Sequence, residues 1–245
     1  MLAIKSLTKH FGGIVAVDDV TFSIPEKKIT ALIGPNGAGK TTAMNLISGL
    51  ETPDHGAILL GDRAIGTLNP HDRARRGISR TFQLIRLWPN MTVAEHLALS
   101  MQTDDEQFWH SVFQPSEPSR RDLVATLARV GLPRELLTHT GEELSYGQRK
   151  LLSLAMALVH PHMVLLLDEP VAGVNPVVRD EIKKILRDLR AAGETILLIE
   201  HDMHFVMDLA DHVIVMEGGK LLTQGTPQEV QKDPKVLEAY LGEQL

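Results

Sequence analysis

A glycine-rich segment ending in Lys-Thr-Thr constrains this chain more than any other feature. It follows the apolar run 30–33 and precedes the helical pattern 43–50. The segment consists of Gly34, Pro35, Asn36, Gly37, Ala38, Gly39, Lys40, Thr41 and Thr42. A strand, a G-x-x-x-x-G-K-T loop and a helix in this order form a phosphate-binding loop, whereas an ordinary glycine-rich turn rarely ends in Lys-Thr.

Each residue type in this loop has a physical reason. The glycines allow positive φ and close approach of the backbone to phosphates. Successive N–H groups and the positive end of the following helix then form a concave anion site. Lys40 supplies a charge for the β- and γ-phosphates, and the Thr41 hydroxyl is a ligand for Mg²⁺. The segment therefore predicts a site for a nucleoside triphosphate.

Composition excludes several other classes of protein. The length of 245 residues allows one large domain or two small ones, with 43% hydrophobic residues for a core. A net charge of −6 argues against a general nucleic-acid binder. With no cysteine there are no disulfides or thiolate metal sites. The start lacks a signal-peptide core, and no apolar run approaches the roughly 20 residues of a membrane-spanning helix.

The pattern along the chain alternates between strands and helices. Short alternating strands are expected in the first thirty residues, and 57–60 with the turn 61–63 reads as a hairpin. Residues 84–160 are mostly helical in pattern, whereas 163–167 and 195–199 are fully apolar strands of a buried parallel sheet. Thr226-Pro227-Gln228-Glu229 is a capping box that predicts one helix reaching about Tyr240.

Carboxylates and a histidine follow the two apolar strands. Asp168 and Glu169 come directly after 163–167, and His201 follows 196–199 and Glu200. The carboxyl edge of a parallel sheet is where ligands bind in α/β folds. We expect Asp168 to hold Mg²⁺, Glu169 to polarise the attacking water, and His201 to donate to a γ-phosphate oxygen. Gln83 could reach Mg²⁺ or that water, but alone it is indistinguishable from a loop glutamine.

A second anion site is suggested by Leu144-Ser145-Tyr146-Gly147-Gln148 before a helical pattern. Ser145 is a natural N-cap, which places its hydroxyl and the Gly147 N–H at a positive helix end. From spacing alone, a plain capped helix explains these residues equally well.

Taken together, these segments resemble the ATP-binding cassette (ABC) ATPases. The matching features are the phosphate loop, Gln83, the Leu-Ser-x-Gly-Gln signature at 144–148, Asp168-Glu169-Pro170 and His201, in the order and spacing of that family. The resemblance implies an α/β fold with a RecA-like P-loop NTPase core, an antiparallel β subdomain and an inserted helical subdomain. We expect one ABC ATPase domain over 1–245, with its core at about 1–83 and 161–245 and the helical subdomain at about 84–160.

The resemblance also implies an activity and partners. ATP and Mg²⁺ are the expected ligands, and Phe11 is expected to stack on adenine, the alternative being a buried phenylalanine. Two such ATPases meet head to tail, so that Ser145, Gly147 and Gln148 of the signature close over ATP held by the other. Transmembrane permease subunits are expected to dock near Gln83, where Leu87 and Trp88 are either apolar contacts or core residues, and a substrate-binding protein is an indirect partner. The expected location is peripheral, on the cytoplasmic face of the membrane.

Two departures from the usual pattern point to one branch of the family. Tyr146 stands where glycine is usual, and 171–175 replaces Thr-Ser-Ala-Leu-Asp, with Asn175 in place of the acid. Both resemble the importers of branched-chain and hydrophobic amino acids. The alternatives are a cassette ATPase with another substrate, such as an exporter, or a soluble one in cluster assembly. A GTPase switch lacks support because no Asn-Lys-x-Asp motif is present.

The remaining conspicuous feature is a basic cluster, Arg73, Arg75, Arg76 and Arg80. It reads as a solvated helix face rather than a patch for a membrane or a nucleic acid.

Overall fold

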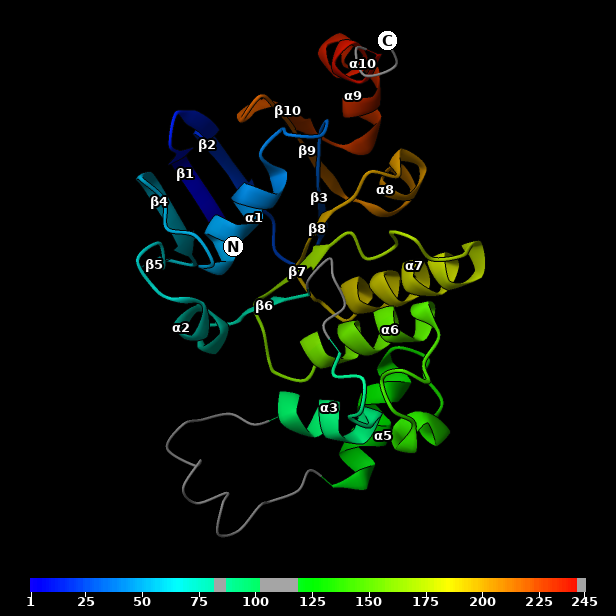
Figure 1. Cartoon of the computed structure of the whole chain (residues 1–245). Helices are drawn as coiled ribbons and strands as arrows, with labels where there is room; N and C mark the ends of the chain where they lie inside the picture. Colours follow the sequence, from blue (N-terminus) through cyan, green and yellow to red (C-terminus); the bar gives the residue numbers. More distant parts are fainter. Residues whose placement is uncertain (82–86, 102–118, 242–245) are drawn as a thin grey trace. The chain divides into compact units, whose positions relative to one another are not determined.

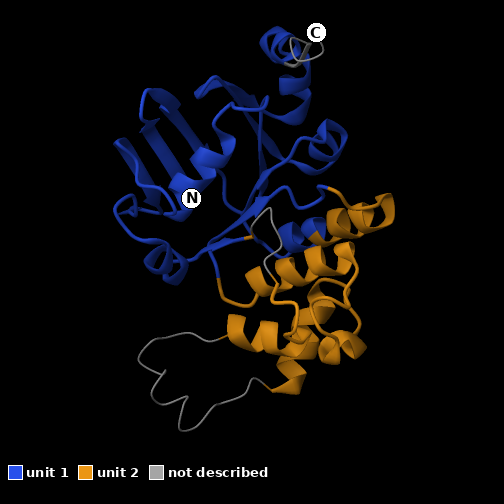
Figure 2. Ribbon diagram, in the orientation of Figure 1, with its two compact units in different colours: residues 1–80, 162–172, 186–245 blue, residues 81–161, 173–185 orange. Residues whose placement is uncertain are grey.

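The computed structural model describes residues 1–81, 87–101 and 119–241. They divide into two compact units, coloured in Figure 2. The first unit holds residues 1–80, 162–172 and 186–245, and the second holds residues 81–161 and 173–185. The Gln83 prediction lies outside the described residues. Among the described residues, no helix is both long and apolar enough to cross a membrane.

The first unit contains two sheets. The antiparallel sheet has the order β2-β1-β4-β5. Its strands are β1 (Leu2–Phe11), β2 (Ile14–Ile24), β4 (His55–Leu60) and β5 (Arg63–Ala64). The second sheet has the order β10-β9-β3-β8-β7-β6. Its strands are β3 (Ile29–Ile33), β6 (Ile78–Arg80), β7 (Val164–Asp168), β8 (Ile196–Ile199), β9 (His212–Glu217) and β10 (Lys220–Gly225). The predicted strands and hairpin are confirmed.

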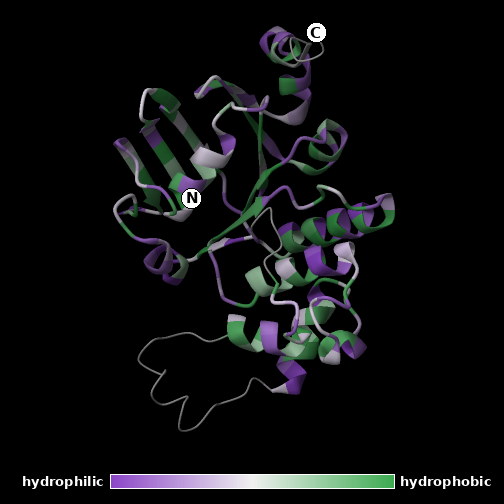
Figure 3. Ribbon diagram, viewed as in Figure 1, coloured by the Kyte–Doolittle hydropathy of each residue, from purple (hydrophilic) through white to green (hydrophobic). Residues whose placement is uncertain are grey.

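The central strands of the second sheet are buried on both faces. Every residue of β3, β7 and β8 is buried, and all the neighbours from β9 to β6 run parallel. Figure 3 shows these strands as a hydrophobic centre. Strands covered on both faces need continuous apolar runs, and the sequence supplies them here.

Helix α1 (Lys40–Ser48) lies in the main hydrophobic core of the first unit (Figure 1). Its buried residues include Met44 and Ile47, which share one core with apolar side chains of both sheets, such as Phe22 of β2 and Leu166 of β7. The helix is thereby fixed to both sheets by apolar packing. The other helices of this unit are α2 (Pro70–Arg75), α8 (Met203–Leu209), α9 (Pro227–Lys232) and α10 (Pro234–Leu241).

The C-terminal prediction needs a correction. The capping box forms, with Thr226 accepting from the Glu229 N–H and Glu229 reaching back to the Thr226 N–H. However, α9 stops at Lys232, Asp233 is extended, and α10 starts at Pro234. Proline lacks an N–H and disfavours helical geometry in the residue before it, so the prediction of one helix through Tyr240 is wrong.

The second unit is helical. Its elements are α3 (Val93–Ser100), α5 (Arg120–Arg129), the 3₁₀ helix η1 (Arg134–Thr138) and α6 (Tyr146–Ala157). Residues 176–185 of α7 (Pro176–Ala191) also cluster with this unit, and the rest of that helix belongs to the first. Its packing includes a buried His96, whose Nε2 accepts from the Trp88 N–H at 3.0 Å.

Candidate functional site

The glycine loop is shaped by backbone contacts that exclude side chains. Gly34 has φ 147° and Gly39 φ 94°. A Cβ at Gly34 would lie 2.0 Å from the carbonyl oxygen of Met216, and one at Gly39 would lie 2.3 Å from that of Ala16. Gly37, with φ 78°, has open space around it. Because no Cβ fits at positions 34 and 39, only glycine permits this tightly wound loop.

The loop leads into the start of α1. Gly39 is the N-cap, and among the described residues no side chain caps this helix. The first N–H groups of a helix lack intrahelical partners, so they are available to an anion. Lys40 is buried, and its Nζ donates to the carbonyl oxygens of Gly34 at 2.7 Å and Pro35 at 2.8 Å. Thr41, one residue further along, is exposed. The arrangement concentrates positive potential at one loop.

The carboxylates and the histidine lie on neighbouring strands. β7 pairs with β8, with Asp168 opposite Ile199, and β8 pairs with β3. Asp168 is buried at the end of β7. Glu169 leaves the strand with φ 48°, and its Oε1 lies 3.0 Å from Nε2 of His201. Since the three parallel strands end at the same edge, the loop, both acids and the histidine belong to one edge of the sheet.

The buried carboxylate of Glu200 hydrogen-bonds to the backbone next to this edge of the sheet. Glu200 accepts from the N–H groups of Val171 at 2.9 Å and His201 at 3.2 Å. Burial raises the pKa of Glu200, and the neighbouring charge of Glu169 adds to the rise, whereas the backbone donors oppose it. The carboxylate joins the segments that follow β7 and β8. Nothing in its sequence context distinguishes it beforehand, except a charge between an apolar strand and His201.

The basic cluster is not the solvated helix face that the sequence suggested. Arg75 and Arg76 are exposed, but Arg73 is 1% exposed and the Arg80 side chain 7%. Arg73 donates to four backbone carbonyl oxygens, those of Leu46, Ile47, Gly66 and Leu68. Arg80 donates to Asp168. Two of the four arginines are therefore internal, because α2 and β6 pass beside α1.

Phe11 is the last residue of β1 and 44% exposed. The alternative that it is a buried phenylalanine is therefore wrong. The Lys9 ammonium lies 5.4 Å from its ring centroid. An exposed ring of this kind can stack on a planar base.

The signature segment forms a capping box in the second unit. Ser145 is the N-cap of α6: its hydroxyl accepts from the Gln148 N–H at 3.3 Å, while the Gln148 side chain accepts from the Ser145 N–H at 2.9 Å. A Cβ on Gly147 would lie 2.7 Å from Cγ2 of Val178. The predicted N-cap is confirmed. Glycine at 147 is explained by packing against the start of α7.

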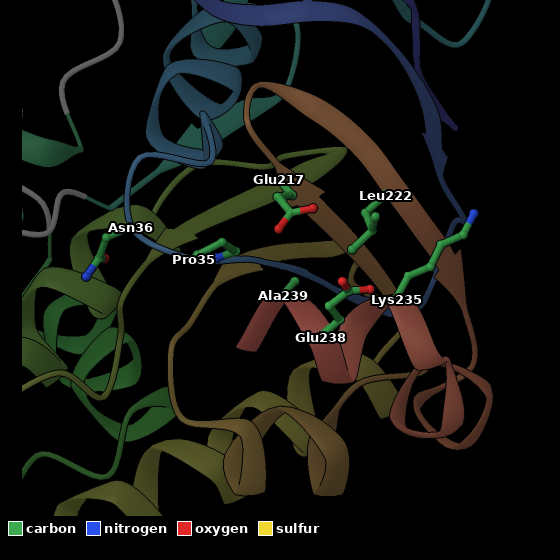
Figure 4. A pocket seen from close by; sticks show the side chains of 7 residues that line it. All are labelled: Pro35, Asn36, Glu217, Leu222, Lys235, Glu238 and Ala239. Carbon is green, nitrogen blue, oxygen red and sulfur yellow. The ribbon is translucent and has the colours of Figure 1, made fainter. Parts of the chain in front are cut away.

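A pocket of about 590 Å³ adjoins the phosphate loop in the first unit. It is lined by Pro35, Asn36, Glu217, Leu222, Lys235, Glu238 and Ala239 (Figure 4). Two of these side chains are carboxylates, which repel phosphate groups. The loop N–H groups are therefore a better candidate for an anion site than this pocket. A smaller pocket of about 450 Å³ is lined in part by Arg63, Arg75 and Arg76.

Comparison with known proteins identifies the family. Residues 17–172 match the family model described as ABC transporter. The chain belongs to this family. Residues 220–245 also match a model described as branched-chain amino acid ATP-binding cassette transporter.

Individual relatives are similar over the whole chain. The chain is 39% identical to the high-affinity branched-chain amino acid transport ATP-binding protein BraF of Pseudomonas aeruginosa, covering 99% of this chain and 98% of that protein. It is 38% identical to LivG of Escherichia coli, with the same coverage and the same description. A crystal structure of the ADP conformation of an ABC transporter cassette superimposes with a TM-score of 0.86 at 33% identity, covering 99% of this chain and 98% of that one. The predicted family and the fold class are confirmed.

Proposed function

We propose that this chain is the ATP-hydrolysing subunit of a membrane importer for branched-chain or other hydrophobic amino acids. The observation that carries the enzymatic part is the pair Glu169–His201, 3.0 Å apart at the sheet edge that also holds the phosphate loop. A general base is effective when a hydrogen bond to another group holds it in place. The amino-acid part is supported by the descriptions of BraF and LivG, at 39% and 38% identity.

The loop would bind the triphosphate of ATP through its own N–H groups and the charge of Lys40. Glycine at 34 and 39 lets the loop pack against the carbonyl oxygens of Met216 and Ala16, and this packing holds the loop in the shape that would present its N–H groups. Lys40 donates to the loop carbonyls of Gly34 and Pro35, so its ammonium already lies within the loop. Phe11 would stack on adenine, given its exposed ring at the end of β1.

Thr41 and Asp168 offer the kind of donors that Mg²⁺ prefers. A threonine hydroxyl at the start of α1 and one buried carboxylate are hard oxygen ligands, which this ion prefers together with water and phosphate oxygens. The described residues contain no group of three or more His, Cys, Asp or Glu that would hold a metal by themselves. When bound, Mg²⁺ would neutralise charge on the β- and γ-phosphates. Thr41 and Asp168 would hold it, and Gln83 is proposed as a further contact.

Glu169 would act as the general base in hydrolysis. Its carboxylate would take a proton from the attacking water. His201, with Nε2 at 3.0 Å from that carboxylate, would have its single N–H shared between Glu169 and a γ-phosphate oxygen. Glu200, by accepting from the His201 N–H, holds the backbone of that histidine in place. Ser145, Gly147 and Gln148 would close the site of a second ATPase subunit, because the N-terminus of α6 is a positive helix end.

The wider assembly follows from this role. We propose permease subunits as membrane partners, a substrate-binding protein as an indirect one, and a peripheral position on the cytoplasmic face. Trp88, 53% exposed, is a candidate contact for a permease. Aromatic side chains exposed in this way are common anchors at interfaces.

The catalytic assignment is tested with Glu169→Gln. We expect ATP binding close to that of the wild type and a loss of steady-state turnover of at least about 100-fold, since a general base contributes roughly 10²–10⁴. Glu181→Gln, at an exposed carboxylate on α7, is the matched control and should retain turnover. Normal turnover in Glu169→Gln would refute the base.

The substrate is tested by purifying the tagged chain with its membrane partners and measuring ATP-dependent leucine uptake in vesicles. Excess isoleucine and valine should compete with leucine. ATP hydrolysis without uptake of any of the three would refute the branched-chain assignment and leave the ATPase assignment standing.

A further inference from the structure

Arg80 occupies an unusual place for an arginine. It is the last residue of β6 and pairs in parallel register with Leu166 of β7. Its side chain is 7% exposed, and that of Asp168 is 5% exposed. A buried guanidinium needs acceptors for its N–H groups, because leaving charge unpaired away from water is costly. The acceptors around Arg80 therefore show which parts of the structure this side chain connects.

The guanidinium bridges two parts of the candidate site. Nη2 donates to Oδ2 of Asp168 at 3.0 Å. Nη1 donates to Oδ1 of Asn45 at 2.8 Å and to the hydroxyl of Ser48 at 2.7 Å. One side of the fork thus holds the carboxylate at the end of β7, and the other holds α1. The planar, rigid guanidinium fixes both directions at once, which a lysine ammonium cannot do.

The face of α1 that Arg80 holds is also the face of Thr41. Positions 41, 45 and 48 are four and three residues apart, so their side chains lie along one side of the helix. Arg80 therefore connects Asp168 to the same helical face that presents the Thr41 hydroxyl one turn away. Both Asp168 and Thr41 are proposed above to hold magnesium.

We propose that Arg80 is a positioning residue for the magnesium site: by clamping Asp168 to the Asn45–Ser48 face of α1, it sets the placement of Asp168 relative to Thr41. This inference rests on the proposed function. The clamp acts on the metal-dependent part of nucleotide binding, since Lys40 is held separately, by the loop carbonyls of Gly34 and Pro35. Loss of the clamp should therefore weaken the use of Mg²⁺ and leave binding by the loop intact.

The test measures binding of a fluorescent ATP analogue to the purified chain, without turnover, in EDTA and across a Mg²⁺ titration. In Arg80→Met we expect the affinity in EDTA to stay within about twofold of that of the wild type. The half-saturating Mg²⁺ concentration, which gives half of the metal-dependent gain in affinity, should rise about tenfold, because a charge-assisted hydrogen bond to Asp168 is lost. Arg80→Lys should have a half-saturating Mg²⁺ concentration between those of the wild type and Arg80→Met. Arg187→Met, at an exposed arginine 2.9 Å from Asp208, is the matched control and should change neither quantity.

A second variant separates the clamp from the charge of Arg80. Asn45→Ala/Ser48→Ala leaves the Arg80–Asp168 pair in place and removes the attachment to α1. It should also raise the half-saturating Mg²⁺ concentration, by about threefold or more, and it remains informative if Arg80→Met does not fold. The clamp is overturned if the folded variants show unchanged Mg²⁺ dependence or lose affinity equally in EDTA and in Mg²⁺. A lower half-saturating concentration in Arg80→Met would also overturn it, since that marks charge compensation alone.

The outcomes distinguish this inference from the proposed function. Failure of the wild-type chain to bind the nucleotide analogue, or binding without any response to Mg²⁺, would overturn the proposed function and the clamp with it. Metal-dependent binding by the wild type with no shift in the variants overturns the clamp only.

Discussion

Replacing Arg73 with methionine should lower the free energy of unfolding by about 3 kcal/mol, because methionine keeps much of the apolar stem but none of the donors. Arg73 is 1% exposed and lies against the C-terminal end of α1. Its Nη1 donates to the carbonyl oxygens of Leu46 and Ile47 in the last turn of that helix. The last four carbonyls of a helix have no intrahelical partner, so the guanidinium supplies what the helix cannot.

The magnitude comes from the four acceptors taken in turn. The bonds to Leu46 and Ile47 are buried, so leaving those carbonyls unpaired costs about 1–1.5 kcal/mol each. The bonds to Gly66 and Leu68 are partly buried, and water can replace them, at about 0.5 kcal/mol each. Arg73 is 1% exposed, so its charge is desolvated, and this burial lowers the pKa of its guanidinium. Removing the charge of Arg73 regains less than about 1 kcal/mol of stability, because four carbonyl dipoles already solvate that charge.

Urea unfolding followed by far-ultraviolet circular dichroism measures this loss. With a slope of about 3 kcal/mol/M, the midpoint should fall by about 1 M at an unchanged slope. Arg187→Met is the control, because that arginine is 44% exposed and its pair with Asp208 is solvated. Such a surface pair contributes less than about 1 kcal/mol. If the two variants unfold within about 0.2 M of each other, the reasoning about the helix end is wrong.

Two further variants test the loop and the buried acid. Gly39→Ala should weaken ATP binding at least about tenfold, because its Cβ would lie 2.3 Å from the Ala16 carbonyl at φ 94°, whereas Gly37→Ala, with open space, should lose less. Equal losses in a fluorescence binding assay would contradict this. Burial raises the pKa of Glu200 above its ordinary value of 4.5. Protonation of Glu200 therefore stabilises the folded state, fully below pH 4.5, and this stabilisation is lost as the pH rises through the raised pKa. The melting temperature of the wild type relative to Glu200→Gln should therefore fall from pH 4.5 toward neutrality; a constant difference would exclude the effect.

The sheet and the edge that carries the site could be predicted because their signals are local. An uninterrupted apolar run such as 163–167 has one good solution, a strand covered on both faces. The glycine loop needs its glycines for steric reasons that the motif already expresses. Once three such strands are parallel neighbours, the meeting of Glu169 and His201, 32 residues apart, follows from topology.

The buried arginines could not be predicted from the same reasoning. Arg73 and Arg80 have acceptors on α1 that lie 26 to 35 residues away in sequence. The pattern of charges along the chain shows only that these arginines are close to one another, so it does not indicate such distant acceptors. A short helix such as α2 has too few residues to show which side is buried. The break at Pro234 is different, because the proline is visible in the sequence and its effect on Asp233 is a local steric one.

Both departures from the usual cassette pattern are explained by local contacts within the second unit. A Cβ on Gly173 would lie 3.3 Å from Cε1 of Tyr146, and Gly173 has φ 72°. The large ring in the signature segment thus lies against a loop position where even alanine would be both crowded and strained. Asn175 accepts from the Val178 N–H at 3.0 Å, which is the capping contact that an acid would make at the start of α7. Glycine at 173 is therefore favoured by its positive φ and by the neighbouring Tyr146 ring, and asparagine at 175 preserves the start of the helix that follows.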